Sequence, residues 1–201
     1  MSTTSSRLSK PARREQLLDA ALEIVRTQGA DALTLVTLAE GAGVSRPIAY
    51  DHFGTRAGLL IALYRRLEEQ HRTAVSDALR SAAPDAAVLA RVMSVTYFAC
   101  ATDMPEFGAL SAALKGDPEM EAAQHELLDA YTTEMVTALV PHSDVSAEAL
   151  RLRCIGVLGA AEAIATELVH GRATRDTAVD ALADLILHGI TTGTAEPASE
   201  A

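Results

Sequence analysis

The chain contains no tryptophan, and aromatic residues make up only 3% of its 201 residues. Hydrophobic residues account for 49% of the sequence, and most of them are alanine, leucine or valine. This composition favours closely packed helices, because sheets are enriched in aromatic and β-branched residues. We therefore predict an all-α protein, long enough to bury a substantial core.

Long apolar runs are also missing. Charged residues interrupt every apolar stretch well before the ~20 residues that a membrane helix needs, and no signal-peptide pattern opens the chain. Cys100 and Cys154 stand in apolar surroundings without a CxxC or Cys/His neighbour, which predicts buried thiols rather than a metal or redox site. We expect a cytoplasmic protein with no membrane contact, no metal and no cofactor.

Basic residues are scarce, since the formal net charge is −10, but they are unevenly distributed. Residues 1–56 hold seven Lys/Arg against six Asp/Glu, whereas residues 57–201 hold ten against 21. A chain this acidic is not expected to coat nucleic acid without specificity. The first basic residues, Arg7, Lys10, Arg13 and Arg14, form a tail without acids that either lies along DNA phosphates or stays solvated.

Hydrophobic periodicity and capping residues predict about nine helices. The predicted helices cover residues 13–28, 35–42, 46–52, 55–82, 85–102, 106–114, 118–140, 147–171 and 175–191. Gly29 and Pro84 end two of these helices, and Ser45, Ser146 and Thr174 are suitable N-caps. We predict a three-helix DNA-binding head at residues 1–54 and a larger helical-bundle body for ligand binding and dimerisation at residues 55–201.

The segment TLVTLAEGAGVSRPIAYDHFGTRAGLL, residues 34–60, has the pattern of a helix-turn-helix. This motif needs a small residue where the helices cross, a turn residue that tolerates left-handed geometry, and apolar residues that lock the pair. Ala39, Gly43 and Val44 meet these needs, and Leu38 and Phe53 are expected in the core. The second helix can then enter a DNA major groove with its N-terminal side chains toward the bases.

Through Gly43-Val44-Ser45, Tyr50, His52-Phe53 and Arg56, this segment resembles the helix-turn-helix of the tetracycline-repressor (TetR) family of bacterial transcriptional regulators. The resemblance implies a homodimeric repressor on double-stranded operator DNA. The residues expected to contact DNA are Thr34, Thr37, Ser45, Arg46, Pro47, Ile48, Tyr50, His52 and Arg56.

The resemblance also implies a role for most of these residues. Arg46, Pro47 and Ile48 are expected to face the bases, because Arg bonds guanine bidentately and apolar groups touch the thymine methyl. Tyr50 and His52 are expected to contact phosphates, although either ring can instead be packed in the core. Arg56 is expected to cap the site at the start of the fourth helix.

The segment departs from the family pattern in three ways. Asp51 places an acid where many relatives have an aromatic residue, so phosphate repels it unless it pairs with a base or a nearby arginine. The order Ile48-Ala49 is reversed, which makes a buried Ile48 and an exposed Ala49 an alternative. Val36 stands where some relatives carry a base-reading arginine, so the operator sequence is not readable from this chain.

Small residues crowd the eighth predicted helix. Gly156, Gly159, Ala160 and Ala163 allow close helix contact, and the resemblance implies that the last two helices form a four-helix bundle with a partner chain. The alternative is a packing face inside one chain.

Most of the adaptable and aromatic side chains of the body gather in one region, which suits a small, largely apolar effector that lowers DNA affinity. The predicted ligand-binding residues are Met93, Tyr97, Cys100, Met104, Phe107, Tyr131 and Met135. Residues of these types at helical spacing are also found as ordinary core.

Two other classes of function compete with a ligand-gated repressor. A helical-bundle metalloenzyme needs paired Glu-x-x-His motifs, and Glu167 with His170 supplies only one, while Glu121 and His125 suit an exposed ion pair. Stoichiometric iron or zinc in the purified protein would favour the enzyme. A DNA-binding regulator that senses no ligand is the other alternative, although six helices exceed what dimerisation alone requires.

Overall fold

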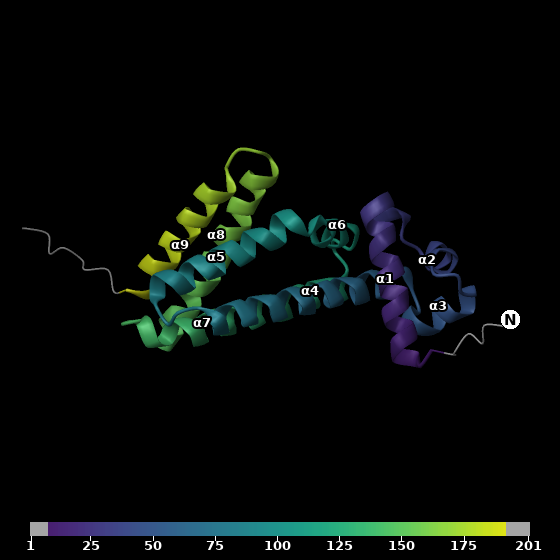
Figure 1. Ribbon diagram of the computed structural model, residues 1–201, viewed down its shortest axis with the longest axis horizontal. Coiled ribbons are helices and arrows are strands. Elements are labelled where there is room, and N and C mark those ends of the chain that lie inside the picture. The colour runs from purple at the N-terminus through teal and green to yellow at the C-terminus, as the bar shows by residue number, and fades with distance from the viewer. Residues whose placement is uncertain (1–7, 192–201) are drawn as a thin grey trace, which may run out of the picture. The chain divides into compact units, whose positions relative to one another are not determined.

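The computed structural model describes residues 8–191, which form two compact units (Figure 1). Unit 1 contains residues 8–69 and 105–123, and unit 2 contains residues 70–104 and 124–191. The α-helices are α1 (Lys10–Gln28), α2 (Leu35–Gly41), α3 (Arg46–Phe53), α4 (Arg56–Ser81), α5 (Ala86–Asp103), α6 (Pro105–Ala113), α7 (Pro118–Leu139), α8 (Ala147–Val169) and α9 (Arg175–Ile190). Short 3₁₀ turns follow α1 and α7, at Ala30–Ala32 and Val140–His142. The predicted all-α fold is therefore confirmed over the described residues.

Helix α1 begins three residues before the predicted start. The Ser9 hydroxyl accepts a hydrogen bond from the Ala12 amide, and Pro11 stands in the first turn, where no amide hydrogen is needed. Lys10, Arg13 and Arg14 of the predicted basic tail therefore lie on a helix. Arg7, the remaining basic residue of that tail, is outside the described residues.

Apolar residues at helical spacing bury the inner face of unit 1. Leu17 on α1, Leu38 and Ala39 on α2, and Ala49 on α3 are each at most 1% exposed, and Phe53 closes the end of α3 at 8%. Burial of these side chains, at about 25 cal/mol per Å² of apolar area, fixes α3 against α1 and α2. The predicted core positions Leu38 and Phe53 are confirmed, and Ala39, predicted as the small residue where the helices cross, is buried as well.

Helix α6 packs in unit 1 although it follows α5 of unit 2 in sequence. The Arg26 guanidinium on α1 forms an ion pair with Glu106, and the Tyr64 ring on α4 meets the Phe107 ring edge-on at 5.1 Å between centroids. The boundary between the two packed units therefore differs from the predicted domain boundary after residue 54. That boundary stays a prediction about where DNA binding ends and ligand binding begins.

Unit 2 is a helical bundle in which α5 and α8 both pack against α9. Its core includes the fully buried Phe98 and, on facing helices, Leu150, Cys154 and Leu182. Burial raises the pKa of the Cys154 thiol to about 11, which suits an unreactive packing residue. Cys100, also a free thiol, is only partly buried.

Side-chain caps start the helices of unit 2 where the sequence predicts. The Ser146 hydroxyl accepts from the Ala149 amide, and Thr174 forms a reciprocal capping box with Thr177. Within residues 8–191, no helix combines the length and the apolar character that crossing a membrane requires.

Candidate nucleic-acid interface and body cavity

The turn between α2 and α3 has the geometry that the sequence predicts. Gly43 has a φ of +64°, a left-handed conformation that costs glycine little. The Val44 amide donates to the Ala39 carbonyl at 2.9 Å and closes the turn. The backbone therefore holds the start of α3 in a defined position.

Thr34 and Thr37 use their hydroxyls to start α2. The Thr37 amide donates to the Thr34 hydroxyl, and the Thr34 amide donates to the Thr37 hydroxyl at 2.9 Å. The Thr37 hydroxyl also donates to the Ala32 carbonyl at 2.8 Å. Both residues thus have a structural role, and their contact with DNA phosphate stays a prediction.

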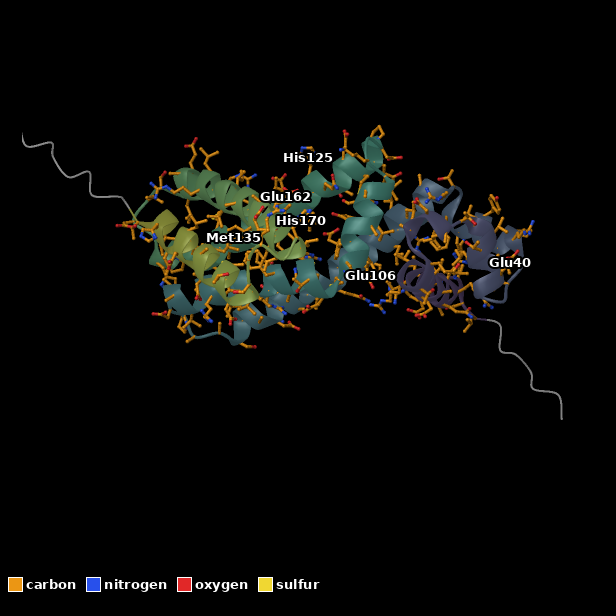
Figure 2. The ribbon with its side chains drawn as sticks, turned by 90° about the horizontal axis from the view of Figure 1, so that it is seen from above. Glu40, Glu106, His125, Met135, Glu162 and His170 are labelled. Atoms are coloured by element: carbon orange, nitrogen blue, oxygen red, sulfur yellow. The ribbon has the colours of Figure 1, made fainter. Side chains whose placement is uncertain are left out.

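The N-terminal side chains of α3 are exposed. Ser45 occupies the N-cap position without a side-chain cap bond, so its hydroxyl is available to a phosphate oxygen. Pro47 is exposed, and the Arg46 side chain is 62% exposed with one ion pair of 3.3 Å to Glu40 on α2 (Figure 2). Because this pair is solvated, it holds Arg46 weakly, and a base edge can displace Glu40.

Ala49 is fully buried and Ile48 only partly, so the alternative in which Ile48 was buried and Ala49 exposed is wrong. Ala49 faces the core because α3 crosses α2 closely there. Ile48 instead lines a shallow surface groove with Lys10, Arg13 and His52. A side chain in that position can reach a thymine methyl group.

The C-terminal half of α3 carries two of the predicted phosphate contacts. Tyr50 is 51% exposed, which leaves its hydroxyl open to solvent. Burial and the nearby positive charge of Lys10 lower the pKa of His52, so near pH 7 its ring is neutral. Asp51 pairs with Lys10 at 3.1 Å, which offsets the repulsion between this acid and DNA phosphate.

Arg14 contacts the end of α3, and the sequence analysis did not predict this contact. Its Nη1 donates to the His52 carbonyl at 2.9 Å, and its guanidinium lies 4.8 Å from the centroid of the Phe53 ring. The charge and the stacking hold the end of α3 against α1. In sequence, Arg14 is simply one of several basic residues near the N-terminus.

Arg56 is bonded to the backbone of unit 1. Its Nε donates to the Leu33 carbonyl at 2.9 Å and its Nη2 to the Ala30 carbonyl at 3.0 Å. These bonds satisfy carbonyls of the turn between α1 and α2. A contact between Arg56 and phosphate stays a prediction, and it competes with this structural role.

Unit 2 contains a small cavity of about 40 Å³ lined by residues of α4, α5, α7 and α8. Its lining includes four of the predicted ligand-binding residues: Met93, Tyr97, Tyr131 and Met135. The lining also includes three polar residues that were not predicted, His71, Thr96 and Glu134. The prediction missed them because it selected only methionine, aromatic and cysteine side chains. Ligand binding in this cavity stays a prediction.

The other three predicted ligand-binding residues do not line this cavity. Phe107 packs on Tyr64 in unit 1, and Met104 follows the last turn of α5. Burial and then the charge of Asp103 raise the pKa of the Cys100 thiol to about 11. Although Cys100, Met104 and Phe107 are close in sequence, the chain passes from unit 2 to unit 1 after Met104, so Phe107 belongs to a different unit from the cavity.

The small residues of α8 lie on an accessible face. Gly156, Gly159 and Ala163 are exposed, and a Cβ added at either glycine meets no atom within 4 Å. Ala160 is partly buried, and Leu152, in register with this face, is 66% exposed. Another helix can pack against this exposed apolar face. Dimerisation through it stays a prediction.

The residues considered for a metal site have other partners. Glu167 accepts two bonds of 2.7 Å from Arg172, and the His170 Nδ1 lies 2.7 Å from the Thr166 carbonyl oxygen. Among residues 8–191, no three His, Cys, Asp or Glu side chains are grouped as metal ligands would be.

Residues 17–63 match the model of the family described as bacterial regulatory proteins, tetR family. The chain is similar to the HTH-type transcriptional regulator BetI of Rhizobium meliloti, with 35% identity over 88 residues, 44% of this chain and 43% of the relative. It is also similar to the HTH-type transcriptional activator FasR of Mycolicibacterium smegmatis, with 37% identity over 76 residues, 38% of this chain and 35% of the relative. The matched segment thus spans less than half the length of these relatives.

The fold extends the similarity beyond that segment. The transcriptional regulator FadR of Bacillus subtilis, solved in complex with stearoyl-CoA, superposes with a TM-score of 0.66 at 16% identity. The match covers 88% of this chain and 98% of FadR. At this identity the similarity concerns the fold alone.

Proposed function

Because the chain belongs to the TetR family of bacterial regulatory proteins, we propose that it is a repressor, which a small, largely apolar ligand releases from a palindromic operator. The observation that carries the proposal is the helix-turn-helix itself. Helix α3 is fixed by Ala49 and Phe53, while Ser45, Arg46 and Pro47 remain exposed at its start. A helix presented in this way fits a major groove.

The proposal includes a homodimer. One short recognition helix reads too few bases for useful specificity, so two copies are needed on half-sites about one helical turn, ~34–36 Å, apart or a multiple of it. The exposed face of α8 with Gly156 and Gly159 supports this assembly, because two such faces can approach closely.

Release by a ligand requires that the ligand binds one conformation of the protein better than the other. Such coupling is typically about 1–3 kcal/mol, and it is reciprocal. The cavity of unit 2 supports this part of the proposal, as does the fold shared with a regulator solved with stearoyl-CoA.

A regulator that senses no ligand is the second candidate, and the size of the cavity favours it. Pockets for drug-sized ligands enclose roughly 300–1,000 Å³. The cavity of about 40 Å³ holds at most a few water molecules, so any larger ligand must open it.

Footprinting on the DNA that flanks its own gene tests the core of the proposal. Protection of an imperfect palindrome is expected, with transcription from an overlapping promoter falling as protein is added. Increased transcription would assign activation, the role named for the relative FasR. Absence of any protected site would refute the proposal.

A ligand screen separates the two candidates. Compounds that raise the thermal stability of the protein are tested for release of the operator, and operator DNA must weaken their binding by the same factor. If every stabilising compound leaves DNA affinity unchanged, the regulator without a ligand is the better description.

A further inference from the structure

Glu40 places a carboxylate on the part of unit 1 that is expected to meet DNA. It lies on α2 at the surface of the unit (Figure 2), its side chain is 66% exposed, and its Oε1 pairs with the Arg46 Nη2 at 3.3 Å. DNA phosphates repel a carboxylate, so an acid in this position weakens DNA binding unless it meets a hydrogen-bond donor. The bases supply such donors in the major groove, namely the amino groups of cytosine and adenine.

The turn between α2 and α3 holds Glu40 and Arg46 close together. Glu40 is the last residue but one of α2, and Arg46 is the first residue of α3. The left-handed Gly43 and the bond from the Val44 amide to the Ala39 carbonyl fix the backbone between them. Wherever Arg46 reaches DNA, the Glu40 carboxylate therefore lies beside it.

The ion pair uses only part of each side chain. The guanidinium of Arg46 has five N–H donors, and Glu40 takes one of them. The other carboxylate oxygen of Glu40, Oε2, has no partner among residues 8–191. Arg46 therefore keeps enough donors for the two acceptors of guanine, O6 and N7, while Glu40 keeps an acceptor for a base amino group.

A G·C base pair offers the complementary groups at a similar spacing. In the major groove guanine O6 lies beside cytosine N4, because these two atoms are hydrogen-bonded to each other at about 2.9 Å. An arginine nitrogen on O6 and a carboxylate oxygen on N4 therefore lie side by side, as the Arg46 Nη2 and the Glu40 Oε1 do at 3.3 Å in the protein. The two side chains can thus contact both bases while they remain neighbours.

We propose that Glu40 and Arg46 together read one G·C base pair in each half-site, with Arg46 donating to guanine and Glu40 accepting from the cytosine amino group. Glu40 is then a specificity-determining residue, because its carboxylate binds cytosine and is repelled by phosphate. The inference rests on the proposed function, since it requires that α3 enters the major groove with Arg46 on guanine. It adds a contact to the second base of the pair.

Asp51, the exposed acid on α3 itself, is less suited to this role. Its carboxylate pairs with Lys10 on α1 at 3.1 Å. It follows Arg46 by five residues, which places it about 140° around the helix and roughly 7.5 Å further along. When the guanidinium of Arg46 lies on guanine, Asp51 is therefore on a different side of α3 from that base pair.

Modified bases test the proposal at single atoms. The unaltered protein first selects its preferred sequence from a pool of random duplexes, and the relevant G·C pair is the one at which Arg46→Ala relaxes the preference. N4-methylcytosine at this position still pairs with guanine, but a methyl group replaces the amino hydrogen in the major groove. It should weaken binding of the unaltered protein about tenfold and of Glu40→Ala less than about twofold. 7-Deazaguanine, which lacks N7, should weaken binding of both.

Glu23→Ala provides the matched control. Glu23 is an exposed acid on α1, 13 residues beyond Lys10 and thus roughly 20 Å further along that helix. This variant should respond to N4-methylcytosine as the unaltered protein does. An equal response of Glu40→Ala and the unaltered protein, or no response of the unaltered protein, would overturn the proposal. Loss of the response in Asp51→Ala alone would assign the cytosine contact to Asp51 and would also overturn it.

Affinity for unselected DNA separates this role of Glu40 from a structural one. Glu40→Ala removes a negative charge near phosphate, so its affinity for random duplexes should rise or stay equal, while its preference for the selected sequence falls about tenfold. A variant that merely destabilises α2 would instead lose affinity for both kinds of DNA, and this result would contradict the proposal.

The selection also separates failure of the cytosine contact from failure of the proposed function. If no sequence is enriched, the proposed function fails and the cytosine contact with it. If a sequence is enriched without a G·C pair that depends on Arg46, or if Glu40→Ala responds to N4-methylcytosine as the unaltered protein does, only the cytosine contact fails.

Discussion

The guanidinium groups of Arg46 and Arg56 have different partners. Arg46 is exposed at the start of α3, with one solvated ion pair to Glu40. Arg56 donates to the carbonyls of Leu33 and Ala30. The first arginine is therefore available to a ligand such as DNA, and the second holds unit 1 together.

Alanine at each position should separate these roles. Arg46→Ala should cost about 1–3 kcal/mol of DNA affinity and relax the base preference at one position in each half-site. Arg56→Ala should instead lower the free energy of unfolding by about 1–3 kcal/mol, because two carbonyls lose a charged donor. Competition binding at several salt concentrations and chemical denaturation measure the two effects. A flattened salt dependence in Arg56→Ala, with unchanged stability, would show that Arg56 contacts phosphate.

His71 makes stability depend on pH. Because burial lowers its pKa in the folded protein, the unfolded chain takes up a proton first as the pH falls below the ordinary value of 6.5. Folded protein is therefore destabilised progressively from about pH 6.5 down to the folded pKa, and no further below it. In His71→Leu this part of the pH dependence should be absent.

Denaturation at several pH values between 5 and 7.5 measures the difference between the two proteins. His52 contributes in the same direction, since burial and Lys10 lower its pKa, but it is common to both proteins and cancels. Substitution of the exposed His188 by glutamine provides the control. A constant difference in unfolding free energy across this range would contradict the assignment to His71.

At the scale of helices, the sequence predicts the elements well because the signals are local. Apolar spacing and the caps Ser146 and Thr174 lie within a few residues of the boundaries that they set. The apolar pattern predicts a start of α1 three residues too late, because the Ser9 cap and Pro11 precede that pattern. Contacts between distant segments, such as Arg14 with the His52 carbonyl, leave no such signal.

In the candidate sites too, local features can be predicted from the sequence, whereas contacts between distant segments cannot. Exposure of the start of α3 follows from the motif, whereas the bonds that occupy Thr37 and Arg56 depend on backbone carbonyls placed by the fold. In the body, residue type predicted part of the cavity lining but could not separate Tyr97 from Phe107. Tyr97 lines the cavity and Phe107 does not, because Tyr97 lies in unit 2 and Phe107 in unit 1.

Gly58, near the start of α4, is required by a contact that the sequence does not reveal. A Cβ at this position would lie 2.4 Å from the Phe53 carbonyl oxygen, which belongs to backbone and cannot turn away. Gly58→Ala should therefore destabilise the protein by about 1–3 kcal/mol, since the junction of α3 and α4 must shift.

Thermal unfolding measures this effect, with Gly108→Ala on α6 as the control. A Cβ at Gly108 meets no atom within 4 Å, so alanine there should be neutral or stabilising by about 0.5–1 kcal/mol. Equal melting temperatures for the two variants would show that α3 and α4 adjust at little cost.

At the scale of the whole molecule, the exposed face of α8 predicts how copies assemble. A Cβ at Gly159 meets no atom within 4 Å among the described residues, so Gly159→Leu should leave the folded subunit intact while overpacking a close contact between subunits. Sedimentation at micromolar concentration should show the unaltered protein as a dimer and the variant shifted toward monomer.

Ala87→Leu, an exposed position on α5 outside this face, adds the same bulk and should remain dimeric. A monomeric unaltered protein would refute the homodimer. A dimeric Gly159→Leu protein would move the interface away from this part of α8.

The placement of α6 has a consequence for synthesis on the ribosome. The polypeptide leaves the ribosome from its N-terminus at roughly 5–20 residues per second, and domains tend to fold as they emerge. Unit 1 lacks the partners of Arg26 and Tyr64 until Glu106 and Phe107 have been made, after α5 of the other unit. A nascent chain that ends soon after the helix-turn-helix therefore cannot complete unit 1. Binding of DNA at full strength should await a chain more than half translated.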